Sequence, residues 1–296
     1  MNDSRSAPEA VTIRPPREPE WRVCRMLLPD AFRHAVPPDC LLAVSPRPPY
    51  VVGAVAYHAG PRALHGVRVR VIREHRRRGI GRRLMGAVLD KAAAQGAVRV
   101  MGLGDPKTDP ESEAFASALG FSRDCRLTTF ECDLELMAQF MCALRDRILS
   151  RQKLPPGAEI VWLPAAPKEE VARLYAEFIM HSPDYPVAVM AHALENGRLD
   201  HSPVLLAEGR VGAMVIWELV ETVAVVHARV MTPPFQRGWA NPCLMATALE
   251  RGREVGVRRV RFESRDDNLD TLKLARRFQS DVLRVRDTYV RILADE

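Results

Sequence analysis

The chain has 296 residues, of which 47% are hydrophobic and 27% are charged, and its formal net charge at pH 7 is +6. This length can bury more than one hydrophobic core and favours two domains over one. No apolar run is long enough to span a bilayer, and the N-terminus lacks the apolar segment of a signal peptide, so we expect neither a membrane partner nor export.

The spacing of the cysteines indicates the cellular compartment, and the pattern of charges indicates which partners are disfavoured. Six cysteines are scattered without CxxC pairs, which is typical of reduced thiols in a cytoplasmic protein. Acidic and basic residues alternate along most of the chain, and no basic patch interleaved with aromatic residues accompanies the positive charge. A nucleic-acid partner is therefore disfavoured. We find no metal-ligand spacing and no Ser/His/Asp grouping.

The first half alternates between strand-like and helix-like segments. Residues 1–10 have the composition of a mobile tail. The period of the apolar residues and the positions of turn residues predict the rest. The expected strands are 11–13, 40–44, 50–57, 67–71, 98–103 and 126–133, and the expected helices are 18–32, 80–95 and 109–119. This order predicts a mixed α/β sheet with helices interleaved.

A basic glycine loop joins the central strand to the helix that follows it. The loop reads Arg76-Arg-Arg-Gly79-Ile-Gly81, and seven arginines lie between residues 70 and 83. The first N–H groups of a helix have no internal partner, and glycines let an anion approach the main chain. The loop therefore predicts a diphosphate-binding site. A P-loop would need a lysine after the glycine, and a GxGxxG dinucleotide loop would need glycine where Leu84 stands.

The second half repeats the first with a shift of 160 residues. Equivalent pairs at this shift are Arg76 and Gln236, Leu84 and Leu244, Leu89 and Leu249, Gly96 and Gly256, and Val100 and Val260. The repeat predicts a strand at 223–230, a helix at 240–255, a strand at 257–262 and a helix at 268–278. Between the copies, 134–148 has the spacing of an amphipathic helix, and 150–157 is a polar segment broken by prolines.

The loop, in this setting, resembles a known signature. Arg76-x-x-Gly79-x-Gly81 is similar to the acyl-CoA pyrophosphate signature of the GCN5-related N-acetyltransferase (GNAT) family, and Asn268 to Ala275 resembles the helix after the fifth strand of that family. The resemblance implies an α/β fold of two tandem GNAT-like domains, each with a mixed, splayed central sheet flanked by helices. We expect a tail at 1–10, domains at 11–133 and 158–296, and a linker helix with a Pro-rich linker at 134–157.

The resemblance also implies a reaction and a set of binding residues. Acyl-CoA, with acetyl-CoA as the first candidate, would lie in the splay of the first domain, where an amine attacks the thioester directly. A base removes the proton of the amine, an acid or water protonates the thiolate, and a strand N–H meets the oxyanion. Pantetheine would pair near Val69, Val71 and Ile72. The diphosphate would be bound at Arg76, Arg77, Arg78, Gly79, Ile80, Gly81 and Arg82.

Two departures from the family pattern affect function. At the shift of 160, Trp239 and Asn241 replace the two glycines, so we expect the second domain to be degenerate, to bind no CoA, and to shape either the acceptor cleft or a homodimer surface. The tyrosine that often protonates the thiolate has no counterpart in either copy. Tyr57 and His65 are the acid/base candidates that remain, against the plainer interpretation that both are structural.

The sequence therefore predicts an acyl-CoA-dependent N-acyltransferase acting on a primary amine. The alternative is a non-catalytic acyl-CoA-binding or regulatory protein, which the lack of the tyrosine favours. A basic nucleic-acid-associated module is the weakest of the three interpretations.

Overall fold

The computed structural model describes residues 11–32, 36–60, 62–104, 111–151, 157–179, 187–236 and 238–294. The expected tail at 1–10 and most of the expected linker at 150–157 lie outside these ranges. The chain divides into two compact units. Unit 1 consists of Met1–Asp124 and Asp287–Glu296, and unit 2 of Cys125–Arg286.

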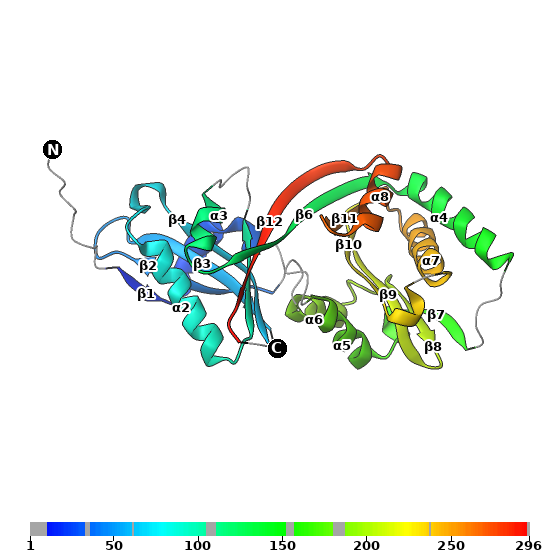
Figure 1. Ribbon diagram of the computed structural model, residues 1–296, viewed down its shortest axis with the longest axis horizontal. Coiled ribbons are helices and arrows are strands. Elements are labelled where there is room, and N and C mark those ends of the chain that lie inside the picture. The colour runs from blue at the N-terminus through cyan, green and yellow to red at the C-terminus, as the bar shows by residue number, and fades with distance from the viewer. Residues whose placement is uncertain are drawn as a thin grey trace. The chain divides into compact units, whose positions relative to one another are not determined.

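Unit 1 is built on a sheet with helices on both faces (Figure 1). Its strands are β1 (Thr12–Arg14), β2 (Asp39–Val44), β3 (Val51–Ala59), β4 (Ala63–Val71), β5 (Arg99–Gly104), the start of β6 (Ser122–Asp133) and the end of β12 (Asp281–Ile292). Its α-helices are α1 (Trp21–Leu27), α2 (Ile80–Ala94) and α3 (Ser112–Ser117), and its short 3-10 turns are η1 (Glu18–Glu20), η2 (Pro29–Phe32) and η3 (Arg73–His75). The single helix expected at 18–32 is interrupted, because Pro29 lacks the N–H that a continuing helix needs.

The sheet of unit 1 splays between β4 and β5. The strand order is β1-β2-β3-β4-β5-β12, and β4 and β5 are parallel neighbours. Their register begins with Ala63 opposite Arg99 and ends with Val67 opposite Gly102, although β4 continues to Val71. Beyond Val67 the two strands diverge, as the sequence resemblance implied.

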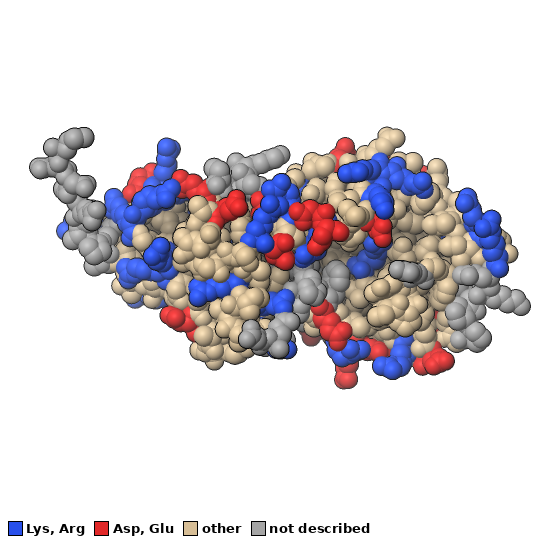
Figure 2. Space-filling model, in the orientation of Figure 1, with Lys and Arg blue, Asp and Glu red and all other residues tan. Residues whose placement is uncertain are grey.

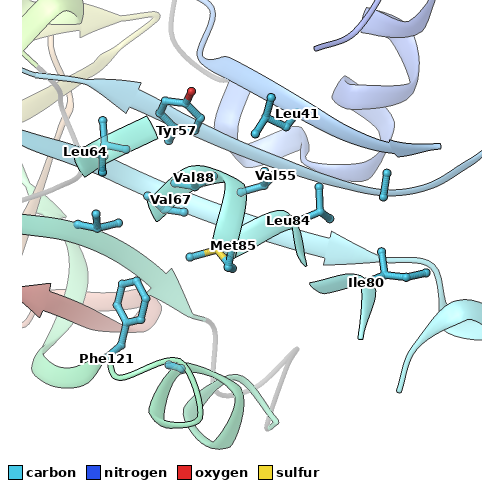
Figure 3. Close-up of a cluster of buried hydrophobic side chains, with 14 of the residues drawn as sticks. Leu41, Val55, Tyr57, Leu64, Val67, Ile80, Leu84, Met85, Val88 and Phe121 are labelled. Atoms are coloured by element: carbon cyan, nitrogen blue, oxygen red, sulfur yellow. The ribbon is translucent and has the colours of Figure 1, made fainter. Parts of the chain in front are cut away.

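The two faces of this sheet have separate cores. On one face, Leu84, Met85 and Val88 of α2 pack onto Val55 and Val67 of the strands (Figure 3). On the other face, α1 and η2 cover the small side chains of β3. That second core contains Cys24, Leu28, Ala31, Cys40, Leu42, Ala54 and Ala56. From Val67 onward, successive residues of β4 therefore point to α2 and to the α1 side in turn.

Unit 2 repeats this arrangement. Its strands are β7 (Ala158–Trp162), β8 (Pro203–Ala207), β9 (Arg210–Val220), β10 (Val223–Met231), β11 (Arg259–Arg265) and the remaining parts of β6 and β12. Its helices are α4 (Leu134–Leu149), α5 (Lys168–Ile179), α6 (Val187–Glu195), α7 (Ala240–Glu254) and α8 (Leu269–Arg277), with short turns η4 (Leu163–Ala165) and η5 (Pro233–Phe235). The sheet order is β6-β11-β10-β9-β8-β7.

The repeat predicted from the sequence holds to the residue. α2 and α7 each have 15 residues, and they begin at Ile80 and Ala240. The parallel register of β10 with β11 begins with Val223 opposite Arg259, which is the register of β4 with β5 moved by the same shift. Unit 2 therefore also splays at its centre, and the fold class of two tandem GNAT-like domains is confirmed.

The compact units differ from the contiguous domains that the sequence suggested. β6 starts in unit 1 and passes into unit 2 after Asp124, and β12 passes in the opposite direction after Arg286. In each unit the parallel strand β5 or β11 is thus bordered by a strand from the other half of the sequence. The expected linker helix, α4, is part of the unit 2 core. It packs against α7, and Arg145 is paired with Glu250 at 2.6 Å.

Candidate functional site

The loop after β4 is anchored to the sheet by hydrogen bonds. The Ile72 N–H donates to the carbonyl of Val52 at 3.0 Å, and the His75 N–H donates to the carbonyl of Ile72 at 3.0 Å. The Arg76 side chain folds back, and its Nε donates to the carbonyl of Val71 at 3.1 Å. The start of α2 therefore has a fixed position relative to the open end of β4.

The two glycines of the loop have different surroundings. Gly79 caps the N-terminus of α2 with a left-handed backbone, φ +77°, and a Cβ built there would meet no atom within 4 Å. Gly81 lies beneath the Phe115 ring, which would be 3.2 Å from a Cβ. Gly79 therefore leaves open space in front of the unpaired N–H groups at the start of α2, whereas Gly81 makes room for α3.

Arginines surround this open helix end. Figure 2 shows basic side chains over the part of unit 1 where the loop between β4 and α2 lies. Arg77 is held by Glu111 at 2.8 Å, and Arg83 donates to the carbonyl of Val11. Arg73 and Arg82 are exposed and make no ion pair with a described residue. Exposed cations and a helix N-terminus together favour a multiply charged anion.

The hydrophobic residues predicted to border the ligand line the splay. Val69 and Val71 pack partly buried against the core under α2, and Ile80 is buried in the same core. Val69 and Val71 both lie beyond the last register pair between β4 and β5. Their backbone therefore borders the gap between the strands, on the side that leads to the loop.

Tyr57 lies deep in the core of unit 1. It is 1% exposed and packs beside Leu64, at the end of α2 opposite Ile80 (Figure 3). Burial raises the pKa of its hydroxyl, and the nearby Lys91 acts in the opposite direction. Its predicted role in proton transfer stays a prediction.

His65 points to the other face of the sheet, next to Leu64 in the chain. It is 2% exposed, and its Nδ1 has no hydrogen-bond partner. Burial, followed by the neighbouring His58 and Arg99, lowers the pKa of His65 to about 4. His65 is therefore neutral near pH 7. The structure does not bring it together with Tyr57, and its catalytic role also stays a prediction.

The buried imidazole should make unit 1 sensitive to mild acid. Between about pH 6.5 and pH 4 the unfolded chain binds a proton at His65 and the folded chain does not, so stability falls as pH falls. We expect a loss of about 2 kcal/mol between pH 7 and pH 5 from this group. His65→Leu should remove that loss in urea unfolding, whereas His192→Leu in unit 2 should retain it. An unchanged pH dependence in His65→Leu would assign the acid sensitivity elsewhere.

Sequence reasoning missed a tyrosine near the splay. Tyr289 belongs to β12, stands opposite Gly102 in the register, and is 6% exposed in the core of unit 1. Gly102 is also the partner of Val67 at the point where β4 and β5 separate. Burial raises the pKa of Tyr289, and the nearby Ser112 of α3 acts in the opposite direction. No local signal reveals this residue, because 185 positions separate it from Gly104, against which its ring packs.

The corresponding gap in unit 2 is bridged by an arginine. Arg229 stands at the position of Val69, and its Nη1 donates to Asn241 Oδ1 at 3.2 Å. Its Nη2 donates to Thr271 Oγ1 at 3.0 Å. Burial lowers the pKa of this guanidinium. Arg229 thus links β10 to the first turns of α7 and α8, next to the gap that the diverging strands leave.

Trp239 stands in unit 2 at the position of Gly79. Its ring meets that of Phe235 edge-on, with centroids 6.1 Å apart, and packs against the core of unit 2. It caps α7 with an ordinary helical backbone, φ −81°, where Gly79 has a left-handed one. Unit 2 therefore differs from unit 1 in the loop backbone as well as in the bridge formed by Arg229.

The described residues contain neither a membrane-spanning helix nor a metal-binding cluster. None of their helices is both long and apolar enough to cross a membrane. In the same part of the chain, no group of three or more His, Cys, Asp or Glu side chains could hold a metal ion.

One known protein family matches part of the first half of the chain. Residues 9–121 match the family described as "Acetyltransferase (GNAT) family". No curated protein sequence matches the chain.

Solved structures resemble the whole chain. A GCN5-related N-acetyltransferase from Sphaerobacter thermophilus is 13% identical, with 98% of each chain covered and a TM-score of 0.63. A tandem GNAT protein from the clavulanic acid biosynthesis pathway is 18% identical, with 97% of this chain and 99% of that chain covered and a TM-score of 0.55. At these identities the likeness concerns the fold.

Proposed function

We propose, from the match of residues 9–121 to the acetyltransferase (GNAT) family, that the protein is an N-acyltransferase that transfers an acetyl group from acetyl-CoA to a primary amine. The observation that carries this proposal is the open helix end at Gly79. There, a left-handed glycine with empty space beside it lies in a loop with several exposed arginines. A side chain at that position would fill the space that a diphosphate needs.

The binding residues are assigned from that point outward. The diphosphate meets the N–H groups between Arg77 and Arg82, and the guanidinium groups around the loop balance its charge. Gly79 supplies the open approach, and Ile80 anchors the helix in the core. Pantetheine then follows the unpaired edge of β4 along Val71 and Val69, with Ile72 at its phosphate end, toward the last register pair at Val67.

Proton transfers complete the reaction. The amine attacks the thioester carbonyl, the C–S bond breaks, and the thiolate takes up a proton. Tyr289 stands one strand away from the point of divergence, and its raised pKa keeps the phenol protonated at neutral pH, so we add it to Tyr57 as a candidate proton donor. His65, neutral at this pH, is the candidate acceptor of the amine proton.

Two measurements test this function. CoA should raise the unfolding temperature of the protein, because a ligand that binds only the folded state stabilises it. Thiol release from acetyl-CoA, followed across a panel of primary amines, should then identify an acceptor that is acetylated. CoA binding without thiol release from any amine would favour the alternative, a non-catalytic acyl-CoA-binding or regulatory protein.

CoA affinity should also depend on salt. The arginines around the loop are exposed, so their attraction for phosphate is screened as the Debye length shortens from about 10 Å at 0.1 M to about 3 Å at 1 M salt. We expect CoA to bind several-fold more weakly at 1 M, while pantetheine, which carries no phosphate, should bind about equally at both. Calorimetric titration measures both ligands. A CoA affinity that is the same at 0.1 M and 1 M salt would show that these arginines do not face the ligand.

The compartment and the assembly are proposed on the same basis. None of the six cysteines, all of which lie in the described part of the chain, forms a disulfide, in keeping with a reducing cytoplasm. We assign unit 2 a supporting role, at the acceptor side or at a homodimer surface.

A further inference from the structure

The acceptor must approach the splay from one particular face of unit 1. On the α2 face, Val67, Val69 and Val71 pack into the core. The gap beyond Val67 is therefore closed on that side by α2 and by the ligand that the loop would hold. An amine that meets a thioester in the gap would therefore come from the opposite face, where α1 and η2 lie over β3.

The β4 side chains that border the gap on this opposite face are both arginines. Arg68 and Arg70 alternate with Val67, Val69 and Val71, so they point away from α2. Their register partners on β3 are Ala56 and Ala54, which are buried in the core with α1 and η2. An apolar or cationic acceptor would gain nothing from such a lining.

The two arginines of this edge differ in their partners. Arg68 Nη1 lies 3.6 Å from Asp30 Oδ2 of η2. Arg70 is exposed and makes no ion pair with a described residue. Arg70 thus offers this edge a guanidinium that makes no ion pair with a described residue, and an arginine fork suits an acidic group better than any neutral one.

We propose, building on the function proposed above, that the acceptor amine carries an acidic group, a carboxylate or a phosphate, which Arg70 binds with the help of Arg68. The acidic group would lie on the α1 side of β4, while the amine points into the gap. Arg70 then determines acceptor specificity without taking part in the proton transfers.

Matched amines test this proposal. β-Alanine is compared with β-alaninamide, and O-phosphoethanolamine with ethanolamine. Dissociation constants are measured by NMR titration, both with and without saturating CoA, and acetylation is followed by thiol release. We expect at least one acidic member to bind about 10- to 100-fold more tightly than its neutral counterpart, the gain typical of hydrogen bonds to charged groups. The pair with the larger difference distinguishes carboxylate from phosphate.

Variants of Arg70 test whether this residue causes the preference for the acidic amine. Arg70→Gln should remove the preference for the acidic member while leaving the affinity for CoA and for the neutral member unchanged, and Arg70→Lys should restore part of it. Arg276→Gln, an exposed arginine of α8 in unit 2, is the matched control and should change neither. Equal or undetectable binding of the acidic and neutral members, or equal weakening of both by Arg70→Gln, would overturn the proposal. Loss of CoA binding in the unmodified protein would instead overturn the proposed function.

Discussion

Replacing Gly79 with tryptophan should abolish CoA binding and leave the protein folded. The backbone at Gly79 has φ +77° and opens onto empty space, so an indole there would occupy the approach to the first N–H groups of α2. A phosphate that loses two charge-assisted hydrogen bonds, each contributing about 1.5–3 kcal/mol, binds at least about 100-fold more weakly. Calorimetric titration with CoA is the measurement.

Gly96 offers a matched control for this variant. It ends the same helix region with φ +68°, and a Cβ there would also meet nothing within 4 Å. Tryptophan at either position carries a similar backbone strain, of about 1–3 kcal/mol for a left-handed residue. Gly96→Trp should therefore lower the unfolding temperature about as much as Gly79→Trp but keep normal affinity for CoA. Unchanged affinity in Gly79→Trp would show that the loop does not hold the diphosphate.

The unmodified protein should bind one CoA per chain. The two copies share their strands, helices and splayed register, so the fold by itself would suggest two sites. In unit 2, however, Arg229 lies where Val69 lies in unit 1, and it is hydrogen-bonded to Asn241 and Thr271. A pantetheine arm cannot occupy a path crossed by a guanidinium, and the two helix ends already surround a cation.

Opening the second unit should create a second site. Arg229→Val combined with Trp239→Gly and Asn241→Gly gives unit 2 the residues that unit 1 has at Val69, Gly79 and Gly81. We expect the stoichiometry in calorimetry to rise from one toward two. The control Arg261→Val removes an arginine of β11 that is paired with Glu131 and lies outside the bridge, so it should leave the stoichiometry at one. A stoichiometry of two in the unmodified protein, or of one in the folded triple variant, would contradict the role of Arg229.

Local sequence patterns predicted most of the elements. Residue periodicity and turn chemistry act within a few residues, and here they agree with tertiary packing. Helix α2 begins at Ile80 because Gly79 can adopt a left-handed backbone, and the alternation in β4 follows from one buried face. The helix expected at 18–32 failed at Pro29, where a missing N–H outweighs the apolar spacing.

The candidate site likewise contains some residues that the sequence could predict and others that it could not. The loop from Arg76 to Arg82 could be predicted because a diphosphate site at a helix N-terminus is made from consecutive residues. The surroundings of Gly81 could not, since Phe115 reaches it from another helix. The contact of Trp239 could not be predicted either, because its ring packs edge-on against Phe235 of the preceding turn. Arg229 appeared from the sequence as one arginine among many.

By itself, then, the sequence determined the two copies, their shift of 160 residues, and the loop that distinguishes one from the other. Only the tertiary structure decided which strands border β5 and β11, that Tyr289 of the last strand enters the core of unit 1, and that Arg229 bridges the gap in unit 2. The physical reason is the distance along the chain over which each interaction acts. The alternation of apolar and polar residues predicts which face of a strand is buried. The edge of a sheet, however, can pair with any extended segment of matching pattern, near or far in the chain.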